Sequence, residues 1–381
     1  MHDFDTLWRV VKTQYTLIDS PDISDRWECV RDTLRPRISA SNAVGLMNEA
    51  LDALTDTQVS LDDTAVDAWR RHPSESDIDA TFDLQGSAIV REVRARTPAM
   101  RMGVRPGDEI VAVNGVAVAT ATRLALPACV PHTKPAAQNW ALQRIISGKK
   151  GASRAIEFRT LDGRTRTLYL APPYIEKSRS AARRLPNGVV IIPLTALSNA
   201  ATLKRFEATL RRNADARAII LDLRESADDD TQGNQESAFL GRFVAHETAY
   251  LHVQASGKPE RVLNTQPSST PTISAPVAVI VGPWTAGAGA RLALGLHALR
   301  GAPVVGARMS AQSGLLERFT LSGSGLSFNL PTQKIRPHNL GSMDAFTPLP
   351  SPRNDYGTDL VFSEALRALA LPPATKPESA K

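Results

Sequence analysis

Residues 276–314 of the chain read PVAVIVGPWTAGAGARLALGLHALRGAPVVGARMSAQSG. The stretch opens with the apolar, β-branched run 277–281, bounded by a proline and a glycine, which is typical of a strand buried on both faces. A turn of small residues follows at 285–290, then leucines at helical spacing, and then a second β-branched pair at 304–305. This order predicts a βαβ crossover, whose turn lies at the carboxyl end of a parallel strand, where open α/β sheets bind their ligands.

The length and composition indicate an ordinary globular protein of several modules. A chain of 381 residues suits two or three modules, and 42% hydrophobic with 22% charged residues is a typical balance. The net charge of +6 is modest. Its densest basic stretch, residues 164–184, alternates with apolar strand residues and is interpreted as a solvated face. We therefore expect no nucleic-acid partner.

Two cysteines and the absence of long apolar runs bear on the compartment. Cys29 and Cys129 form one widely spaced pair, which is no disulfide framework, so their spacing does not predict a bond. No window approaches the roughly 18 apolar residues of a membrane-spanning helix. The chain opens without a basic and then apolar leader. We expect a cytoplasmic protein if the chain is complete, and a periplasmic or exported one if a leader has been removed.

The first 62 residues are predicted to be helical. Apolar residues recur at helical spacing over 4–18, 27–34 and 43–54, which indicates three amphipathic helices. From 61 to 79 the sequence turns polar, as a linker does. We take residues 1–62 as an N-terminal helical region.

A second module is expected over residues 80–172. Residues 86–118 read GSAIVREVRARTPAMRMGVRPGDEIVAVNGVAV, in which Asn114-Gly115 between two apolar runs is a strong hairpin signal. A helix over 140–146 and a further hairpin complete the module. The string closely resembles the long pattern of PDZ domains, [S/T]-P-A-x-x-x-G-[LV]-x-x-G-D-x-I-x-x-V-[ND]-G, which implies an inserted PDZ-like β domain.

The resemblance implies a way of binding peptides. A PDZ domain adds a peptide terminus to its sheet as an extra strand and holds the carboxylate on backbone amides of a glycine-rich loop. We place that loop just before Ile89, where residues 82–86 match it poorly, so a module that serves only for packing is the alternative. The candidate peptide-binding residues are Gly86, Ser87, Ala88 and Ile89.

Residues 185–371 are predicted to form the α/β core, followed by a disordered tail at 372–381. Strands, helices and one hairpin alternate along this part of the chain. The expected elements are strands at 189–194 and 218–224, helices at 201–211 and 235–244, the βαβ unit described above, a hairpin over 318–330, and a closing amphipathic helix at 359–369.

Within this core, PWTAGAGARLALGL and VVGARMSAQSG resemble the nucleophile segment of the C-terminal processing peptidase and tricorn-core family of serine peptidases, which includes the tail-specific proteases. The resemblance covers roughly residues 7–369 and implies an α/β fold with a ClpP/crotonase-like ββα core. The family writes the turn as T-A-S-A-[SG]-E, and its Ser is the nucleophile. The counterpart of that Ser is Gly287, which has no hydroxyl with which to form a covalent intermediate.

The bases of both family branches are also replaced. The processing branch uses a Lys downstream of the Ser, and the corresponding residue is Gln312. The tricorn-like branch takes its His from L-x-D-x-H-V-S-L, which matches residues 54–61 with Gln58 at the His position. A carboxamide is a poor proton acceptor near neutral pH, so neither residue can serve as a general base.

Three further positions depart from the family. The acid after the turn is Ala290, and the Glu of V-V-G-E is Ala307. The family motif D-L-R-x-N-x-G-G supplies half of the oxyanion hole from glycine amides. Residues 222–224 keep Asp-Leu-Arg, but ESADDD follows at 225–230, and its acids would repel an oxyanion.

These departures predict a pseudo-peptidase that binds peptides or a partner protein. The bare start of the helix, with Ala288 and Gly289 after Gly287, is a candidate anion site that suits a peptide carboxylate. The alternative is an active serine endopeptidase or C-terminal processing peptidase with relocated residues. Nearby hydroxyls, those of Thr285, Ser310 and Ser313, have no His or Lys motif beside them. A third interpretation is a small-ligand carrier.

No cofactor and no metal site are predicted. The seven histidines are scattered, and His246 and His252 are spaced too widely for a helical metal pair. The expected partners are a peptide or a protein, with neither nucleic acid nor membrane, and assembly as a homo-oligomer is left open.

Overall fold

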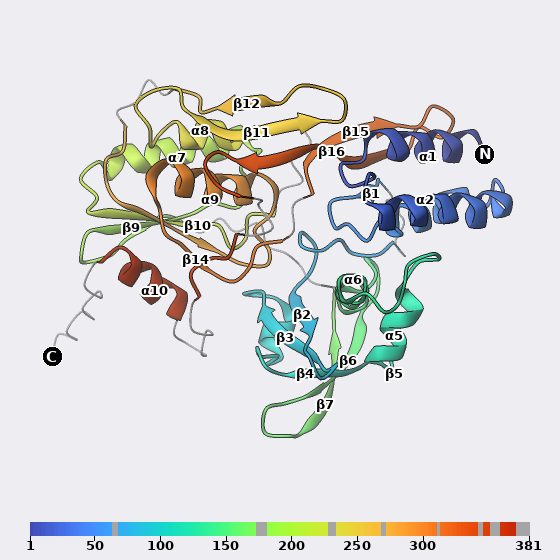
Figure 1. Cartoon of the computed structure of the whole chain (residues 1–381). Helices are drawn as coiled ribbons and strands as arrows, with labels where there is room; N and C mark the ends of the chain where they lie inside the picture. The colour runs from blue at the N-terminus through green and yellow to red at the C-terminus, as the bar shows by residue number, and fades with distance from the viewer. Residues whose placement is uncertain are drawn as a thin grey trace. The chain divides into compact units, whose positions relative to one another are not determined.

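We describe a computed structural model of the chain over residues 1–62, 68–172, 181–227, 234–267, 272–310, 313–341, 346–350 and 359–370 (Figure 1). The chain divides into two compact units. The first comprises Met1–Glu176 with Leu316–Gln333, and the second comprises Lys177–Leu315 with Lys334–Lys381. In the described ranges, no helix combines the length and the apolar character that a bilayer crossing requires.

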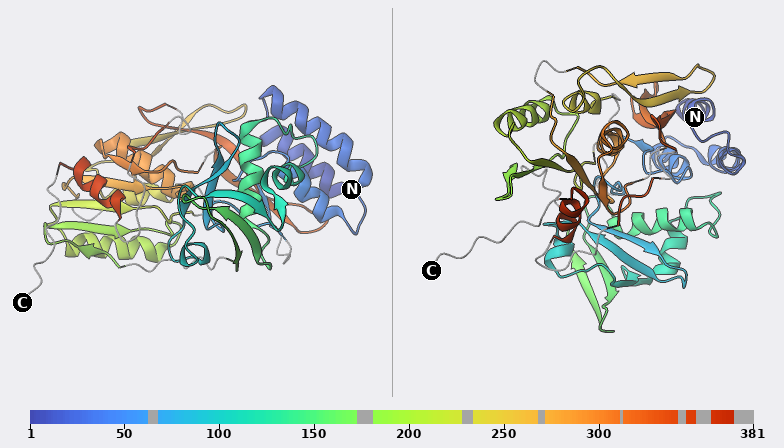
Figure 2. Two further views of the ribbon diagram at one scale, coloured as in Figure 1. Left: turned by 90° about the horizontal axis from the view of Figure 1, so that it is seen from below. Right: turned by 60° about the vertical axis from the view of Figure 1, so that its left-hand side comes forward.

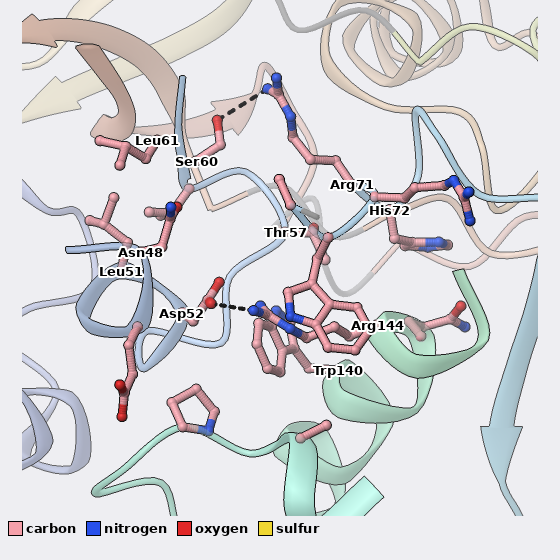
Figure 3. Close-up of a pocket in the computed structure, with 18 of the residues that line it drawn as sticks. Asn48, Leu51, Asp52, Thr57, Ser60, Leu61, Arg71, His72, Trp140 and Arg144 are labelled. Carbon is pink, nitrogen blue, oxygen red and sulfur yellow. Dashed lines mark hydrogen bonds and ion pairs between the residues drawn. The ribbon is translucent and has the colours of Figure 1, made fainter. Parts of the chain in front are cut away.

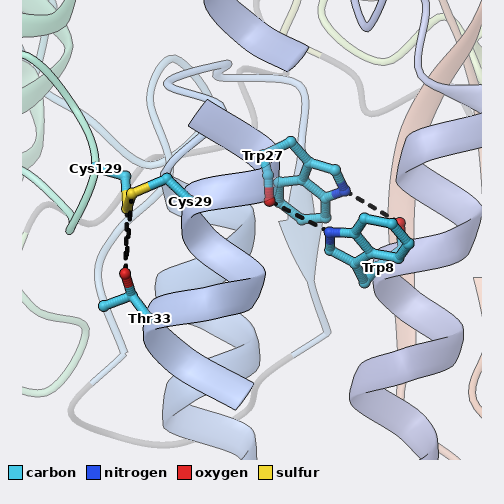
Figure 4. The surroundings of a disulfide bond; sticks show 5 residues. All are labelled: Trp8, Trp27, Cys29, Thr33 and Cys129. Carbon is cyan, nitrogen blue, oxygen red and sulfur yellow. Dashed lines mark hydrogen bonds between the residues drawn. A yellow bond between two sulfur atoms is a disulfide. The ribbon is translucent and has the colours of Figure 1, made fainter. Parts of the chain in front are cut away.

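The first unit begins with the predicted helices, α1 (His2–Gln14), α2 (Pro21–Leu34) and α3 (Ala43–Asp52). Phe4, Leu7 and Val11 form the buried face of α1. The indole Nε1 of Trp8 donates to the carbonyl oxygen of Trp27 at 3.2 Å, and the Nε1 of Trp27 donates to the carbonyl oxygen of Trp8 at 3.1 Å (Figure 4). This reciprocal pair fixes α1 against α2, because each donor is satisfied by the other helix.

A short β layer packs with these helices. The strand β1 (Ser60–Leu61) pairs antiparallel with β16 (Ser327–Pro337), and β15 (Leu315–Thr320) also pairs with β16. Phe328 and Leu330 of β16 are fully buried in the same apolar cluster as the three helices.

A disulfide joins this helical part to a later segment. Cys29 on α2 bonds to Cys129, and their Cα atoms lie 6.0 Å apart (Figure 4). Thr33, one turn after Cys29, places its hydroxyl 3.6 Å from the Sγ of Cys129. The spacing of the cysteines did not predict this bond, which depends on how α2 packs rather than on a local pattern.

The rest of the first unit contains a β domain with its own apolar cluster. The strand order is β2-β3-β4-β6-β7, with β5 on β4. Asn114 and Gly115 both have positive φ and form the predicted hairpin turn between β4 and β5. The bounds are β2 (Ile78–Phe82), β3 (Ala88–Val93), β4 (Glu109–Val113), β5 (Val116–Ala117), β6 (Arg154–Arg159), β7 (Thr165–Leu170), α4 (Pro98–Arg101), α5 (Val118–Ala125) and α6 (Pro135–Ser147).

The second unit contains the predicted α/β sheet, in the order β14-β13-β10-β9-β8. Four of its strands are parallel, and β8 is antiparallel. Strand β13, helix α9 and strand β14 form the predicted βαβ unit, and every residue of β13 is buried. The bounds are β8 (Arg183–Arg184), β9 (Val189–Pro193), β10 (Ala218–Asp222), β13 (Val277–Val281), β14 (Val304–Gly306), α7 (Ala200–Arg212), α8 (Glu236–Leu240), α9 (Gly287–Arg300) and α10 (Leu360–Ala368).

Helices cover both faces of this sheet (Figure 2). Alternate strand residues such as Val279 and Ile280 belong to different apolar clusters. One cluster includes Phe206 of α7 and Leu292 of α9, and the other includes Ala365 of α10. The unit also holds the antiparallel pair β11 (Ala249–Ala255) and β12 (Arg261–Asn264).

Candidate functional site

The turn between β13 and α9 contains the position that corresponds to the nucleophilic Ser of the family resemblance. Gly287 is the first residue of α9, with φ +52°, a backbone conformation that favours glycine. Residues 281–290 are all buried. The strand, the turn and the helix start therefore have the predicted arrangement, but the chain presents no side chain at its central position.

The loop after β10 packs directly on the start of α9. The carbonyl oxygen of Ser226 accepts a hydrogen bond from the amide of Ala286 at 2.8 Å. A Cβ atom on Gly289 would lie 2.4 Å from the Oγ of Ser226, so this close approach requires glycine. A carbonyl and a small polar side chain thus face the helix start at this point.

Three amides next to this turn already have acceptors. The amide of Ala286 donates to Ser226, that of Gly289 donates to the carbonyl of Ala286 at 3.0 Å, and that of Ser226 donates to the carbonyl of Leu223 at 2.9 Å. An oxyanion hole needs donors aimed at the reacting oxygen. These three amides are committed to the fold instead, and the acids at 228–230 lie outside the described residues.

Thr285, the hydroxyl nearest to Gly287 in sequence, has a structural role. Its Oγ1 donates to the carbonyl oxygen of Leu223 at 2.8 Å and accepts from the amide of Gly282 at 2.9 Å, and the residue is fully buried. Ser310 is half-buried, and its amide donates to the carbonyl of Thr285 at 3.1 Å. The hydroxyl of Thr285 is therefore not available as a nucleophile.

Arg224, the last residue of the retained Asp-Leu-Arg, is held by two carboxylates. Its guanidinium contacts Asp222 at 2.8 and 2.9 Å and Asp359 at 2.8 and 3.2 Å. Burial by itself would lower the pKa of Arg224, but the bonds to Asp222 and Asp359 raise it above its ordinary value. The arginine joins the end of β10 to the start of α10, which is a structural role.

Helix α9 carries one partner of a buried ion pair, Arg291, one turn after Gly287. The Nε and Nη2 of Arg291 lie 2.8 and 2.9 Å from the two carboxylate oxygens of Glu236, and both side chains are almost fully buried. The hydroxyl of Tyr250 donates to the same carboxylate at 2.9 Å. This pair joins α9 to α8 and β11.

The other family positions belong to different elements of the chain. Ala307 follows β14 and is half-buried, and Ala290 is buried in α9. Gln312 lies outside the described residues. Gln58 belongs to the first unit, where it is half-buried. Its backbone amide donates to Asp56 Oδ1 at 2.9 Å.

A pocket of about 480 Å³ lies beside Gln58 in the first unit, lined by residues of the segment 56–61 (Figure 3). Arg144 extends into it from α6, with its guanidinium carbon 4.9 Å from the ring centre of Trp69 and 5.0 Å from that of Trp140. Asp52 pairs with the same guanidinium at 2.5 Å, and burial raises its pKa even though Arg144 opposes the shift. The two indole faces are thus occupied by a cation of the chain itself.

The predicted peptide-binding residues of the β domain lie in two different environments. Gly86 is in the turn of the β2–β3 hairpin, and the hydroxyl of Ser87 donates to Glu109 at 3.2 Å. Ala88 and Ile89 are on β3, which pairs with β2 on one side and β4 on the other. Because β3 is an inner strand, Ala88 and Ile89 have strands on both sides, and the nearer edge strand of the sheet is β2.

Side chains of α6 cap that edge of the sheet. The amide of Phe82 donates to the Oδ1 of Asn139 at 2.9 Å, and the Nε2 of Gln143 donates to the carbonyl oxygen of Ala80 at 2.8 Å. The same Nε2 lies 2.8 Å from Asp79 Oδ1. Sequence reasoning missed this pair; the signal was two carboxamides four residues apart, and so on one face of the helix.

Among the described residues, no group of three His, Cys, Asp or Glu side chains is placed to hold a metal ion. The Nε2 of His252 lies 2.8 Å from the Nδ1 of His338, and its Nδ1 lies 2.8 Å from Glu260. The two imidazole rings are stacked.

Known proteins share this architecture. Residues 89–125 match the PDZ domain model, and residues 188–348 match the model of peptidase family S41. The photosystem II D1 C-terminal processing protease is 18% identical, with a TM-score of 0.56 and 94% of each chain covered. Mature CPAF is 11% identical, with a TM-score of 0.62, covering 97% of this chain and 95% of that chain.

A lipoprotein from Streptococcus agalactiae is 12% identical, with a TM-score of 0.50, covering 97% of this chain and 95% of that chain. At these identities the likeness shows a common fold alone. No curated protein matches the sequence significantly. Residues 188–348 thus match peptidase family S41, and residues 89–125 match a PDZ domain, so the chain combines the features of both models.

Proposed function

We propose that the protein is a non-catalytic member of its family, a pseudo-peptidase that captures peptides or a partner protein without cleaving them. One observation carries this proposal: the first residue of α9, at the carboxyl end of β13, is Gly287, where the family resemblance requires a serine. A covalent mechanism needs an attacking atom, and glycine offers none.

The surroundings of Gly287 support loss of activity and not relocation of it. Thr285 donates to Leu223 and accepts from Gly282, so using it as a nucleophile would break both bonds. The amides of Ala286 and Gly289 already donate within the fold. Both family bases are glutamines, and a carboxamide cannot take the proton from a hydroxyl.

Binding is assigned to the PDZ domain rather than to the start of α9. The amide of Gly289 is paired with Ala286, which leaves that of Ala288 as the remaining candidate of the predicted anion site. The PDZ domain, in contrast, presents an open pocket beside Gly86, described below. Peptide recognition is the usual function of this domain class.

The experiment that tests the proposal is a turnover assay. The unaltered chain is incubated with an unfolded casein-like protein and, separately, with a fluorophosphonate probe for activated serines. We expect no cleavage and no labelling. Cleavage by the unaltered chain would refute the proposal, and the variants Thr285→Val, Ser310→Ala and Ser313→Ala would then locate the relocated nucleophile.

Two repaired variants serve as the matched comparison. They are Gly287→Ser with Gln58→His, and Gly287→Ser with Gln312→Lys. We expect at most slow turnover, because position 287 has φ +52° and its neighbouring amides are already paired. Efficient cleavage by either variant would show that the oxyanion site is intact and that only the reacting side chains are missing.

A further inference from the structure

The PDZ domain contains a further pocket, of about 920 Å³, at the Phe82 end of strand β2. It is bounded by the β2–β3 hairpin turn, by α5, by the segment after α5 and by the first turns of α6, which lie together in Figure 1. Asn139 and Gln138 of α6 are on its wall, and the Nε2 of Gln138 donates to the carbonyl oxygen of His132 at 2.8 Å. The pocket is therefore built from four separate parts of one domain.

Its charged groups are predominantly basic. Arg91, Arg123 and His132 line it. The Nε of Arg91 donates to the hydroxyl of Thr81 at 2.9 Å, and in the part of the chain that the structure describes neither arginine has a carboxylate within ion-pair distance. The one acid in the lining is Asp83, whose Oδ1 accepts from the amides of Gln85 and Ser87 at 2.9 Å each. The acid is thus committed to the turn, while the two guanidinium groups keep donors for a ligand.

A buried hydroxyl also lines the pocket without a partner. Thr122 on α5 is 3% exposed, and its Oγ1 makes no hydrogen bond to any described residue. A buried polar atom without a partner is unfavourable, because it has lost its hydrogen bonds to water without replacing them. A ligand with a hydrogen-bonding group at this point would satisfy it.

The remaining lining is apolar. Phe82, Leu126 and Pro135 contribute side chains, and Leu84 at the tip of the hairpin turn is fully exposed to solvent. Large apolar side chains that stand free beside a pocket are typical of recognition surfaces. The pocket can therefore accept an apolar group next to an anionic one.

We propose that this pocket binds an acidic peptide segment, with carboxylate side chains at Arg91 and Arg123 and an apolar side chain against Leu84 and Leu126. The proposal rests on the proposed function and gives it a ligand class. It differs from strand addition, because Asn139 and Gln143 already bond to two backbone groups of the edge strand β2, the amide of Phe82 and the carbonyl of Ala80. Charge complementarity selects an acidic occupant over a neutral or basic one.

The probe is a fluorescein-labelled peptide of alternating Glu and Leu, blocked by an N-terminal acetyl and a C-terminal amide, and the readout is fluorescence anisotropy on the full chain. We expect binding that weakens with added salt. Arg123→Glu should weaken it at least tenfold. Thr122→Val should weaken it severalfold while leaving the unfolding free energy unchanged or raised, since it removes the unpaired hydroxyl at constant shape.

The matched control is Arg164→Glu, which reverses an arginine with an 87% exposed side chain on the β6–β7 turn of the same domain. It makes the same change in net charge, so it should leave binding within about twofold. An equal loss in Arg164→Glu and Arg123→Glu would show a long-range charge effect and would overturn the proposal.

Two further peptides separate the alternatives. A blocked Gln and Leu peptide should bind at least tenfold more weakly than the Glu and Leu peptide. The same neutral peptide with a free C-terminal carboxylate tests recognition of a chain end, and equal affinity for it would overturn the assignment to acidic side chains.

If the chain retains unfolded casein without cleaving it but shows no preference for acidic peptides, the proposed function stands and this inference fails. If the chain cleaves casein and also prefers acidic peptides, the proposed function fails and this inference stands.

Discussion

The side-chain Nε2 of Gln143 on α6 lies 2.8 Å from the carbonyl oxygen of Ala80 on β2. Ala80 is fully buried, and β2 is an edge strand, so the carboxamide supplies a donor that no neighbouring strand can supply. Asn139, one turn earlier on α6, does the same for the amide of Phe82. The domain thus closes its own sheet edge with side chains, which also protects it from pairing with another chain.

Gln143→Leu should destabilise the domain measurably. The substitution leaves the buried carbonyl of Ala80 without a donor, and an orphaned buried acceptor costs about 1–3 kcal/mol. Urea unfolding followed by circular dichroism measures the change. Gln85→Leu, at an exposed turn position, is the control and should stay within about 0.5 kcal/mol. Equal losses in the two variants would show that the cap does not stabilise the edge.

Asp79 should make the stability fall as the pH rises from about 4 to 6. Burial raises its pKa to about 6, although its hydrogen bond to Gln143 opposes the shift. Between the ordinary value near 3.9 and about 6, the native state holds a proton that the unfolded chain has lost. The unfolding free energy therefore decreases through this window, by about 2–3 kcal/mol. Asp79→Asn should remove this slope in urea titrations at pH 4 and pH 7, and an unchanged slope would exclude Asp79 as its source.

His72 should produce the opposite slope in an overlapping window. Burial, assisted by Arg94, lowers its pKa to about 4. Between about pH 6.5 and 4 the unfolded chain binds a proton that the native state excludes, so stability is lost as the pH falls, by about 2–3 kcal/mol. His72→Gln should leave more of the pH 7 stability at pH 5. Comparing it with Asp79→Asn over the same pH series separates the two contributions, and a steeper acid loss in His72→Gln would contradict this assignment.

The buried pair of Glu236 and Arg291 should behave as a unit. Arg291→Met leaves an unpaired carboxylate inside the second unit and should cost about 3–5 kcal/mol. The double variant Glu236→Leu with Arg291→Met removes both charges and should recover most of that loss, although the hydroxyl of Tyr250 then loses one of its two acceptors. Guanidinium unfolding of the three proteins measures the coupling. Additive losses would show that the two charges do not depend on each other.

Reduction of the bond between Cys29 and Cys129 should lower stability. The bond closes a loop with a sequence separation of 100 residues, for which the chain-entropy model gives about 4–5 kcal/mol. The variant Cys29→Ala with Cys129→Ala should reproduce the effect without reductant. If reduced and oxidised protein unfold at the same denaturant concentration, the bond contributes nothing to the fold.

Local patterns in the sequence predicted the elements whose conformation is set by consecutive residues. The β-branched run of β13 is buried on both faces, and the small residues after it allow the tight turn into α9, so the βαβ unit was visible in residues 276–314. The hairpin at Asn114 and Gly115 was visible for the same reason, because both residues need positive φ.

Features that depend on packing between distant segments were not visible. Cys29 and Cys129 meet only because α2 lies against the segment after α5. The sequence showed a turn near Gly86, but it did not show that β3 is an inner strand and that β2 is an edge strand of the sheet. Edge and interior are properties of the assembled sheet and not of a single strand.

The two hydrogen bonds of Thr285 also affect how readily substitutions could give this chain hydrolytic activity. Its hydroxyl, the nearest to the vacant position, ties the start of the turn to the end of the neighbouring strand. Recruiting it for hydrolysis would sacrifice that tie, and restoring Ser at position 287 would still leave the adjacent amides engaged elsewhere. Under the proposed function, hydrolysis would therefore require several coordinated substitutions and not one, which favours further change of this chain as a binder over its conversion to an enzyme.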